Sequence, residues 1–129
     1  MLNDPLAAAM AKIMNAEKVG KREVVIRPTS SLLKRVFGLL QEHNYIGSFE
    51  EVVDGNVAVL RVNLLGNINK CGVIKPRFST KRLEYEKWEK RYLPARDFGV
   101  IVVSTPHGVM THIQAKEKNT GGKLLAFCY

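Results

Sequence analysis

Two adjacent hydroxyl residues, Ser104 and Thr105, and two histidines lie close together in the stretch GVIVVSTPHGVMTH, residues 99–112. Ser104 or Thr105 could act as a nucleophile, with His107 or His112 as its general base. Such a pair also needs a third group that orients the base, and the sequence places none. Because no motif with a known mechanism surrounds these residues, we expect no catalytic residue. A small hydrolase that uses Ser104 with His107 or His112 remains the alternative from the enzyme class.

Neither a metal site nor a nucleotide-phosphate site is indicated by the remaining candidate ligands. His107 and His112 are five residues apart, whereas side chains on one helix face are three or four apart. Cys71 and Cys128 do not form the spaced pairs of zinc sites. The segment GGK at 121–123 lacks the longer P-loop pattern. We therefore expect no metal, no cofactor and no small-molecule substrate.

The charge of the chain favours a polyanionic partner. The formal net charge is +8, with nine Lys/Arg against seven Asp/Glu in residues 1–70 and eleven against five in residues 71–129. A basic domain of this kind attracts polyanions, chiefly nucleic acid or an acidic membrane face, and a basic protein-interaction module is the alternative. No stretch is apolar enough for a transmembrane helix. Two cysteines without a disulfide framework indicate a cytoplasmic protein with reduced thiols.

Apolar periodicity and breaker residues predict the elements of the first half. They are a helix from Pro5 to Gly20, a strand over 22–27, a helix after Thr29-Ser30-Ser31, and a hairpin over 45–65 that turns at Asp54-Gly55-Asn56. The apolar residues of the two helices recur three and four apart, which is typical of helices packed on a core. This half therefore predicts a small α/β domain, residues 1–65.

The second half predicts another small domain, residues 66–129. Its expected elements are strands over 73–78, 99–104 and 123–129, a helix over 84–93 and a short helix around 110–118. Trp88 and Tyr92 are four residues apart and are expected on the buried side of the 84–93 helix. The whole chain then has an α+β fold of two small α/β domains, the first helix-strand-helix-hairpin and the second a mixed sheet with short helices.

Small polar residues stand at the ends of several expected elements, at 29–31, 104–105 and 121–122. Each group exposes short donors and acceptors on backbone that another molecule can approach closely. Such groups suit the shallow minor groove of A-form RNA, where 2′-hydroxyls and base edges are reachable. The apolar strand before residue 104 would anchor its loop in the core and hold the tip rigid.

Four segments carry a resemblance to one family: NDPLAAAMAKIMNA, RPTSSLLKRV, STPHGVMTHIQA and TGGKLLAFCY. In order and spacing they resemble the small-subunit ribosomal protein S8 family over essentially the whole chain. The central segment RFSTKRLEYEKWEKRYLPARDFG is more similar to the archaeal and eukaryotic branch of that family. The resemblance implies a non-enzymatic protein that binds a helical region in the central domain of small-subunit rRNA during assembly, beside neighbouring small-subunit proteins.

The resemblance also implies which residues contact RNA. The C-terminal domain would hold the main contacts: a minor-groove loop of Ser104, Thr105, Pro106, His107 and Gly108, and a neighbouring turn of Gly121, Gly122 and Lys123. The implied N-terminal contact surface is Asn3, Pro5, Asn15, Thr29, Ser30, Ser31 and Lys34. Bacterial relatives usually carry Ser-Lys at 106–107 and Glu at 123, so Lys123 is expected to reach a phosphate here.

Overall fold

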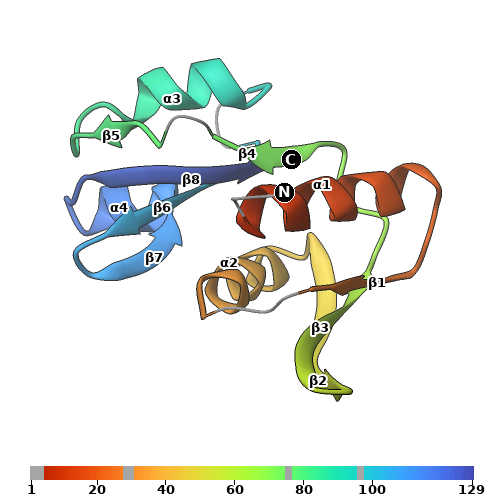
Figure 1. Ribbon diagram of the computed structural model, residues 1–129. Helices are drawn as coiled ribbons and strands as arrows, with labels where there is room; N and C mark the ends of the chain where they lie inside the picture. Colours follow the sequence, from red (N-terminus) through yellow and green to blue (C-terminus); the bar gives the residue numbers. More distant parts are fainter. Residues whose placement is uncertain (1–4, 28–30, 75–76, 96–97) are drawn as a thin grey trace. The chain divides into compact units, whose positions relative to one another are not determined.

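The computed structural model describes residues 5–27, 31–74, 77–95 and 98–129, and the chain divides into two compact units, residues 1–71 and 72–129. Its elements are α1 (Pro5–Lys18), β1 (Glu23–Ile26), α2 (Ser31–Glu42), β2 (Ile46–Asp54), β3 (Val57–Leu64), β4 (Cys71–Val73), β5 (Ser79–Thr80), α3 (Tyr85–Tyr92), β6 (Val100–Thr105), β7 (Gly108–Thr111), α4 (His112–Glu117) and β8 (Gly122–Cys128) (Figure 1). The α+β fold class predicted from the sequence is confirmed. None of the helices in the described ranges is long and apolar enough to cross a membrane.

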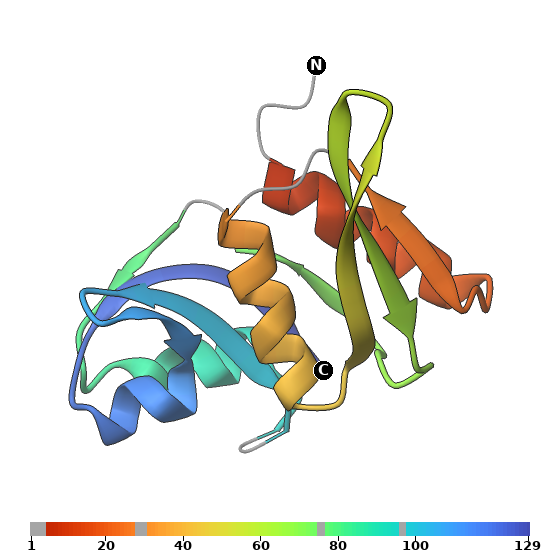
Figure 2. The same cartoon turned by 90° about the horizontal axis from the view of Figure 1, so that it is seen from below.

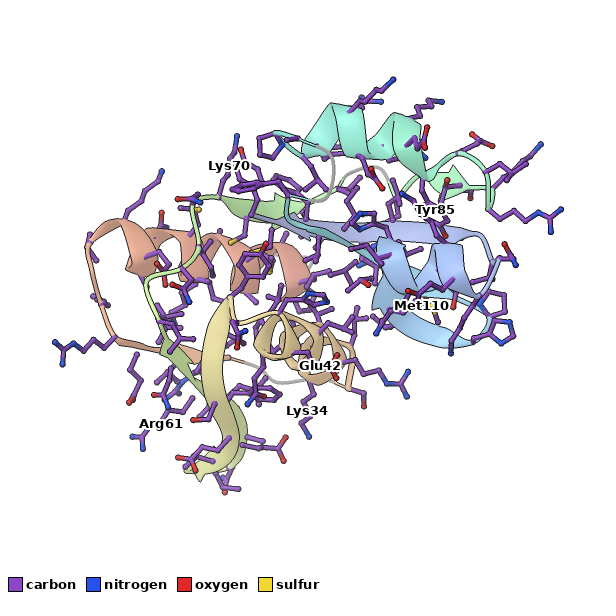
Figure 3. All side chains as sticks on the ribbon, turned by 180° about the vertical axis from the view of Figure 1, so that it is seen from behind. Lys34, Glu42, Arg61, Lys70, Tyr85 and Met110 are labelled. Carbon is purple, nitrogen blue, oxygen red and sulfur yellow. The ribbon has the colours of Figure 1, made fainter. Side chains whose placement is uncertain are left out.

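Three antiparallel strands form the sheet of the first unit, in the order β1-β3-β2, and helices α1 and α2 cover one of its faces (Figure 2). Side chains alternate along β3, as its sequence predicts. Leu60, Val62 and Leu64 are buried beneath the helices. Arg61 and Asn63 are exposed on the opposite face, where Arg61 points away from the helices (Figure 3).

Helix α2 shows how local sequence builds this unit. Its predicted apolar stripe, Leu33, Val36, Phe37 and Leu40, is buried at 1% exposure or less. Burial of each such side chain contributes about 1.5–3 kcal/mol. Helix α1 ends as expected before Gly20, which has a φ of 76° that favours glycine.

The sheet of the second unit has the order β4-β8-β6-β7, with β5 paired to β8 beside this path. Strand β8 runs antiparallel to β5 and β6, and β6 runs antiparallel to β7. One face of the sheet carries the core, in which Ile101, Val103 and Leu124 pack with Tyr85 and Trp88 of α3. Helix α3 lies along β8, as Figure 1 shows. The predicted helix over 84–93 is therefore confirmed, with Trp88 on its buried side.

The strand predicted over 73–78 is wrong. Two short strands flank this range instead: β4 ends at Val73, and β5 comprises only Ser79–Thr80. The sequence over 73–78 contains a proline, which has no N–H to donate to a continuous strand ladder. Residues 75–76 lie outside the described ranges.

The short helix predicted around 110–118 begins later than expected. Met110 belongs to β7, a strand that the sequence did not predict, and α4 begins at His112. A capping box fixes this start: Thr111 Oγ1 accepts from the Gln114 N–H at 3.3 Å, and Gln114 Oε1 accepts from the Thr111 N–H at 3.2 Å. Thr111 and Gln114 have the three-residue spacing of a capping box in the sequence, whereas the four residues of β7 are too few to predict a strand.

Both cysteines, Cys71 and Cys128, are buried thiols outside any disulfide. The Cys71 Sγ–H donates to the Met10 carbonyl at 3.6 Å. Burial, with repulsion from Glu17 as a second cause, raises the pKa of Cys71 from 9.0 to about 12.

Since the thiolate is the reactive form, we expect the folded protein to resist iodoacetamide near pH 8. Mass spectrometry of timed samples should show labelling only after denaturation, and labelling of folded protein at the denatured rate would contradict this.

Candidate nucleic-acid interface

A tight hairpin joins β6 and β7 where the sequence predicted a contact loop. Thr105 pairs with Gly108 across the turn, so Pro106 and His107 lie exposed at its tip. Gly108 has a φ of 117°, a conformation that glycine adopts without strain. The preceding strand residues, Val100–Val103, are at most 2% exposed. The tip is therefore attached to a strand whose side chains are packed in the core.

The Thr105 side chain holds this turn together. Its Oγ1 accepts a hydrogen bond from the His107 N–H at 3.1 Å and donates one to the Gly108 carbonyl at 2.8 Å. The residue is 8% exposed. Because the hydroxyl proton is already committed inside the turn, Thr105 fixes the shape of the tip, and its own contact with RNA stays a prediction.

The double glycine before β8 is required by packing within the sheet. A β-carbon on Gly122 would overlap the Ser104 carbonyl oxygen, and one on Gly121 would overlap the Thr80 carbonyl oxygen. Strand β8 thus lies too close to its neighbours for any side chain at these positions. Glycine is needed here whether or not RNA is bound.

A line of polar side chains crosses one face of the sheet beside the hairpin. Strand register places Ser79 of β5 opposite Lys123 of β8, and Lys123 opposite Ser104 of β6. Residues opposite one another on neighbouring strands share a face and have Cβ atoms about 4.5–5.5 Å apart. Ser79 and Lys123 are exposed and Ser104 is half-buried. We call Ser79, Lys123 and Ser104 the polar row.

Within the described ranges, Lys123 has no carboxylate in ion-pair distance, so its positive charge is available to a partner. Ser79 is the member of the row that sequence reasoning missed. It belongs to a strand of two residues, and such a strand has too few positions to show an alternating pattern. What the sequence offers for finding Ser79 is its position, with Thr80, after the apolar residue Phe78.

The predicted N-terminal contact residues are only partly described. Asn3, Thr29 and Ser30 lie outside the described residues. Four others, which are exposed, belong to the two helices of the first unit: Pro5, Asn15, Ser31 and Lys34. The Lys34 Nζ lies 2.6 Å from Glu51 Oε2 in β2. Its charge is thus partly balanced within the protein.

The second histidine of the opening stretch, His112, is completely buried. Its Nδ1 accepts a hydrogen bond from the Ile101 N–H at 3.1 Å, so the neutral ring carries its proton on Nε2. That Nε2 lies 3.2 Å from Oε1 of Glu89, which is 4% exposed. The same Glu89 oxygen is ion-paired with Lys116 of α4. This cluster ties α3 to α4 and β6.

The structure does not support the hydrolase alternative, because neither His107 nor His112 is placed to act as its general base. One ring nitrogen of His112 accepts a backbone proton and the other faces a carboxylate, so neither can take a proton from a serine. His107 lies at the exposed tip, and among the described residues no carboxylate pairs with it to orient its ring. In the described part of the chain, no group of three or more His, Cys, Asp or Glu is arranged to hold a metal ion.

A family model described as Ribosomal protein S8 matches residues 4–129, nearly the whole chain. Its members are non-enzymatic constituents of the small ribosomal subunit that bind the central domain of small-subunit rRNA. The match spans both units, including the β6–β7 hairpin and the polar row. Because it covers far more than half of the sequence, the chain belongs to the ribosomal protein S8 family and acts in the small subunit as an rRNA-binding structural protein.

Proposed function

We propose that the polar row and the β6–β7 tip form the surface that contacts the helical region of central-domain rRNA. The observation that supports this most directly is the strand register, which aligns two hydroxyls with Lys123 across three strands. In the described ranges this lysine has no ion-pair partner. Hydroxyls and a cation on one rigid strip suit the shallow minor groove of A-form RNA, where 2′-hydroxyls and phosphates lie side by side. The C-terminal domain thus supplies the main contact.

Different residues of this surface contribute in different ways. Lys123 and other cations provide affinity by displacing counterions from the phosphates, while Ser79 and Ser104 set the position on the groove. At the tip, Pro106 has a fixed φ, which lowers the entropy lost on docking. Apart from its two chain neighbours, Gly108 has no described residue within 4 Å of the site of an added β-carbon, so RNA can approach its backbone closely.

The N-terminal unit contributes a contact surface of its own in this proposal. Its exposed members are Pro5, Asn15, Ser31 and Lys34, with Asn3, Thr29 and Ser30 beside them in sequence. We further assign the chain to the archaeal and eukaryotic type, because Pro106-His107 and Lys123 replace the residues usual in bacteria. Neighbouring small-subunit proteins are its proposed protein partners.

Replacing both serines of the polar row tests this surface. Ser79→Ala with Ser104→Ala is expected to weaken binding to the target rRNA helix by roughly tenfold or more, since each lost hydrogen bond costs about 1 kcal/mol. Binding to an unrelated RNA duplex should change little, because phosphate contacts dominate non-specific binding. Filter binding of both RNAs at one salt concentration measures the difference.

Ser48→Ala is the matched control, since Ser48 is an exposed strand serine of the first unit that accepts a hydrogen bond from Asn63 at 2.9 Å. It should leave both affinities unchanged. Equal losses on the two RNAs for the double variant would show that the polar row does not position the protein on its target. Unchanged binding to the target would remove the row from the interface.

A further inference from the structure

Helix α3 has one face buried in the second unit and one face of exposed charge. Tyr85, Trp88 and Glu89 are buried. The Tyr85 hydroxyl donates to the Thr120 carbonyl at 2.8 Å, which directs this side chain toward the turn before β8 (Figure 3). The exposed cations of the helix are Lys87, Lys90 and Arg91. Among the described residues, none of these three has a carboxylate in ion-pair distance.

Aromatic rings hold the Arg91 cation in place. Its guanidinium carbon lies 5.2 Å from the Phe78 ring centre, 5.7 Å from that of Trp88 and 5.6 Å from that of Tyr92. The Lys87 Nζ lies 4.9 Å from the Trp88 ring centre. A guanidinium resting on a ring keeps its N–H edges available, and it loses less freedom when it binds a phosphate.

The α3 cations and the polar row face opposite ways. Helix α3 packs on the sheet face that carries Val103 and Leu124. Ser104 and Lys123 are the next residues along the same strands, so their side chains point to the other face. An RNA helix docked on the polar row would therefore leave Lys87, Lys90 and Arg91 facing away from it.

We propose that Lys87, Lys90 and Arg91 form a second RNA-binding surface, which holds the phosphate backbone of an RNA segment other than the one on the polar row. This proposal rests on the proposed function of the polar row. The three cations lie within one helical turn and are not neutralised by the described part of the protein, which suits a polyanion. RNA is favoured over an acidic protein because the exposed positions of α3 are all charged, whereas a protein interface needs an apolar core. The protein then holds two RNA segments together across one sheet.

A two-RNA binding assay tests this surface. The protein is first saturated with the target rRNA helix, and a labelled duplex RNA of unrelated sequence is then added at low salt. We expect the wild type to form a ternary complex in a gel-shift assay. Lys87→Gln with Lys90→Gln and Arg91→Gln should weaken binding of the second duplex roughly tenfold or more, and reduce its salt slope by about two to three. Its affinity for the target helix should stay within about threefold of wild type, since that contact is on the other face.

Two further variants separate the possible failures. Lys87→Arg with Lys90→Arg keeps the charges and should keep the ternary complex, which assigns the loss in the triple variant to charge. The retained target-helix affinity of the triple variant excludes a folding defect as the cause. Ser79→Ala with Ser104→Ala should weaken target binding and keep binding of the unrelated duplex, so the polar row can fail without the α3 surface failing. Absence of a wild-type ternary complex, or an unaffected triple variant, would overturn the proposal. Displacement of the second duplex by a polyglutamate peptide at lower concentration than by RNA would also overturn it, in favour of an acidic protein partner.

Discussion

Gly122→Ala is expected to destabilise the protein by about 3 kcal/mol or more, although it adds a single methyl group. The new β-carbon would overlap the Ser104 carbonyl oxygen and lie 3.0 Å from the Val103 side chain. A backbone oxygen cannot move aside without separating β8 from β6. These two strands carry much of the second unit's core, and a typical domain has only about 5–15 kcal/mol of stability in total.

Urea unfolding measures this loss, and Gly38→Ala is the control. Gly38 lies in α2 with no atom near the site of an added β-carbon, so alanine there should be neutral or slightly stabilising. RNA binding of Gly122→Ala has to be measured below its unfolding transition, because an unfolded variant loses RNA for an indirect reason. An unchanged unfolding midpoint would mean that β8 is not held as closely to β6 as the structure has it.

Elements that are determined by neighbouring residues could be predicted from the sequence. The stripe Leu33, Val36, Phe37 and Leu40 marks α2 by its spacing alone, and the helix over 84–93 is equally local. The strand β7 was missed because its four residues, Gly108–Thr111, make a pattern too short to distinguish from the start of a helix. A short strand is stabilised by its partner, and the partner cannot be read from the strand itself.

The candidate site follows the same rule. Ser104 and Gly122 were indicated by their positions at the ends of expected elements and by the resemblance. The sequence does not reveal that the two backbones lie so close that a β-carbon on Gly122 would overlap the Ser104 carbonyl oxygen. Ser79 joins the polar row only through the register of β5 against β8. The commitment of Thr105 to its own turn likewise depends on the hairpin geometry. Residue types indicated a contact surface, while strand pairing decides which atoms are available on it.

Glu89→Ala is expected to lower the free energy of unfolding by about 3 kcal/mol, which is the other large effect on stability. The Glu89 carboxylate is 4% exposed and lies between His112 and Lys116. Removing this carboxylate takes a negative charge away from Lys116 and from the His112 ring that it faces. Here the fully buried Nε2 of His112 would lose the carboxylate oxygen that lies 3.2 Å from it. The attachment of α3 to α4 would weaken with it.

Glu89→Gln separates the two parts of this effect. A glutamine side chain keeps the shape of Glu89 and can still place an oxygen opposite His112 Nε2, but it carries no charge for Lys116, whose side chain is 34% exposed and can turn to solvent. We therefore expect Gln to retain more than half of the stability that Ala loses, with exposed Glu86→Ala on the same helix as a neutral control. Fluorescence of Trp88, the single tryptophan, reports unfolding of α3 directly. A Gln variant as unstable as Ala would assign the energy to the Lys116 pair, and an Ala variant as stable as Glu86→Ala would mean that His112 needs no carboxylate.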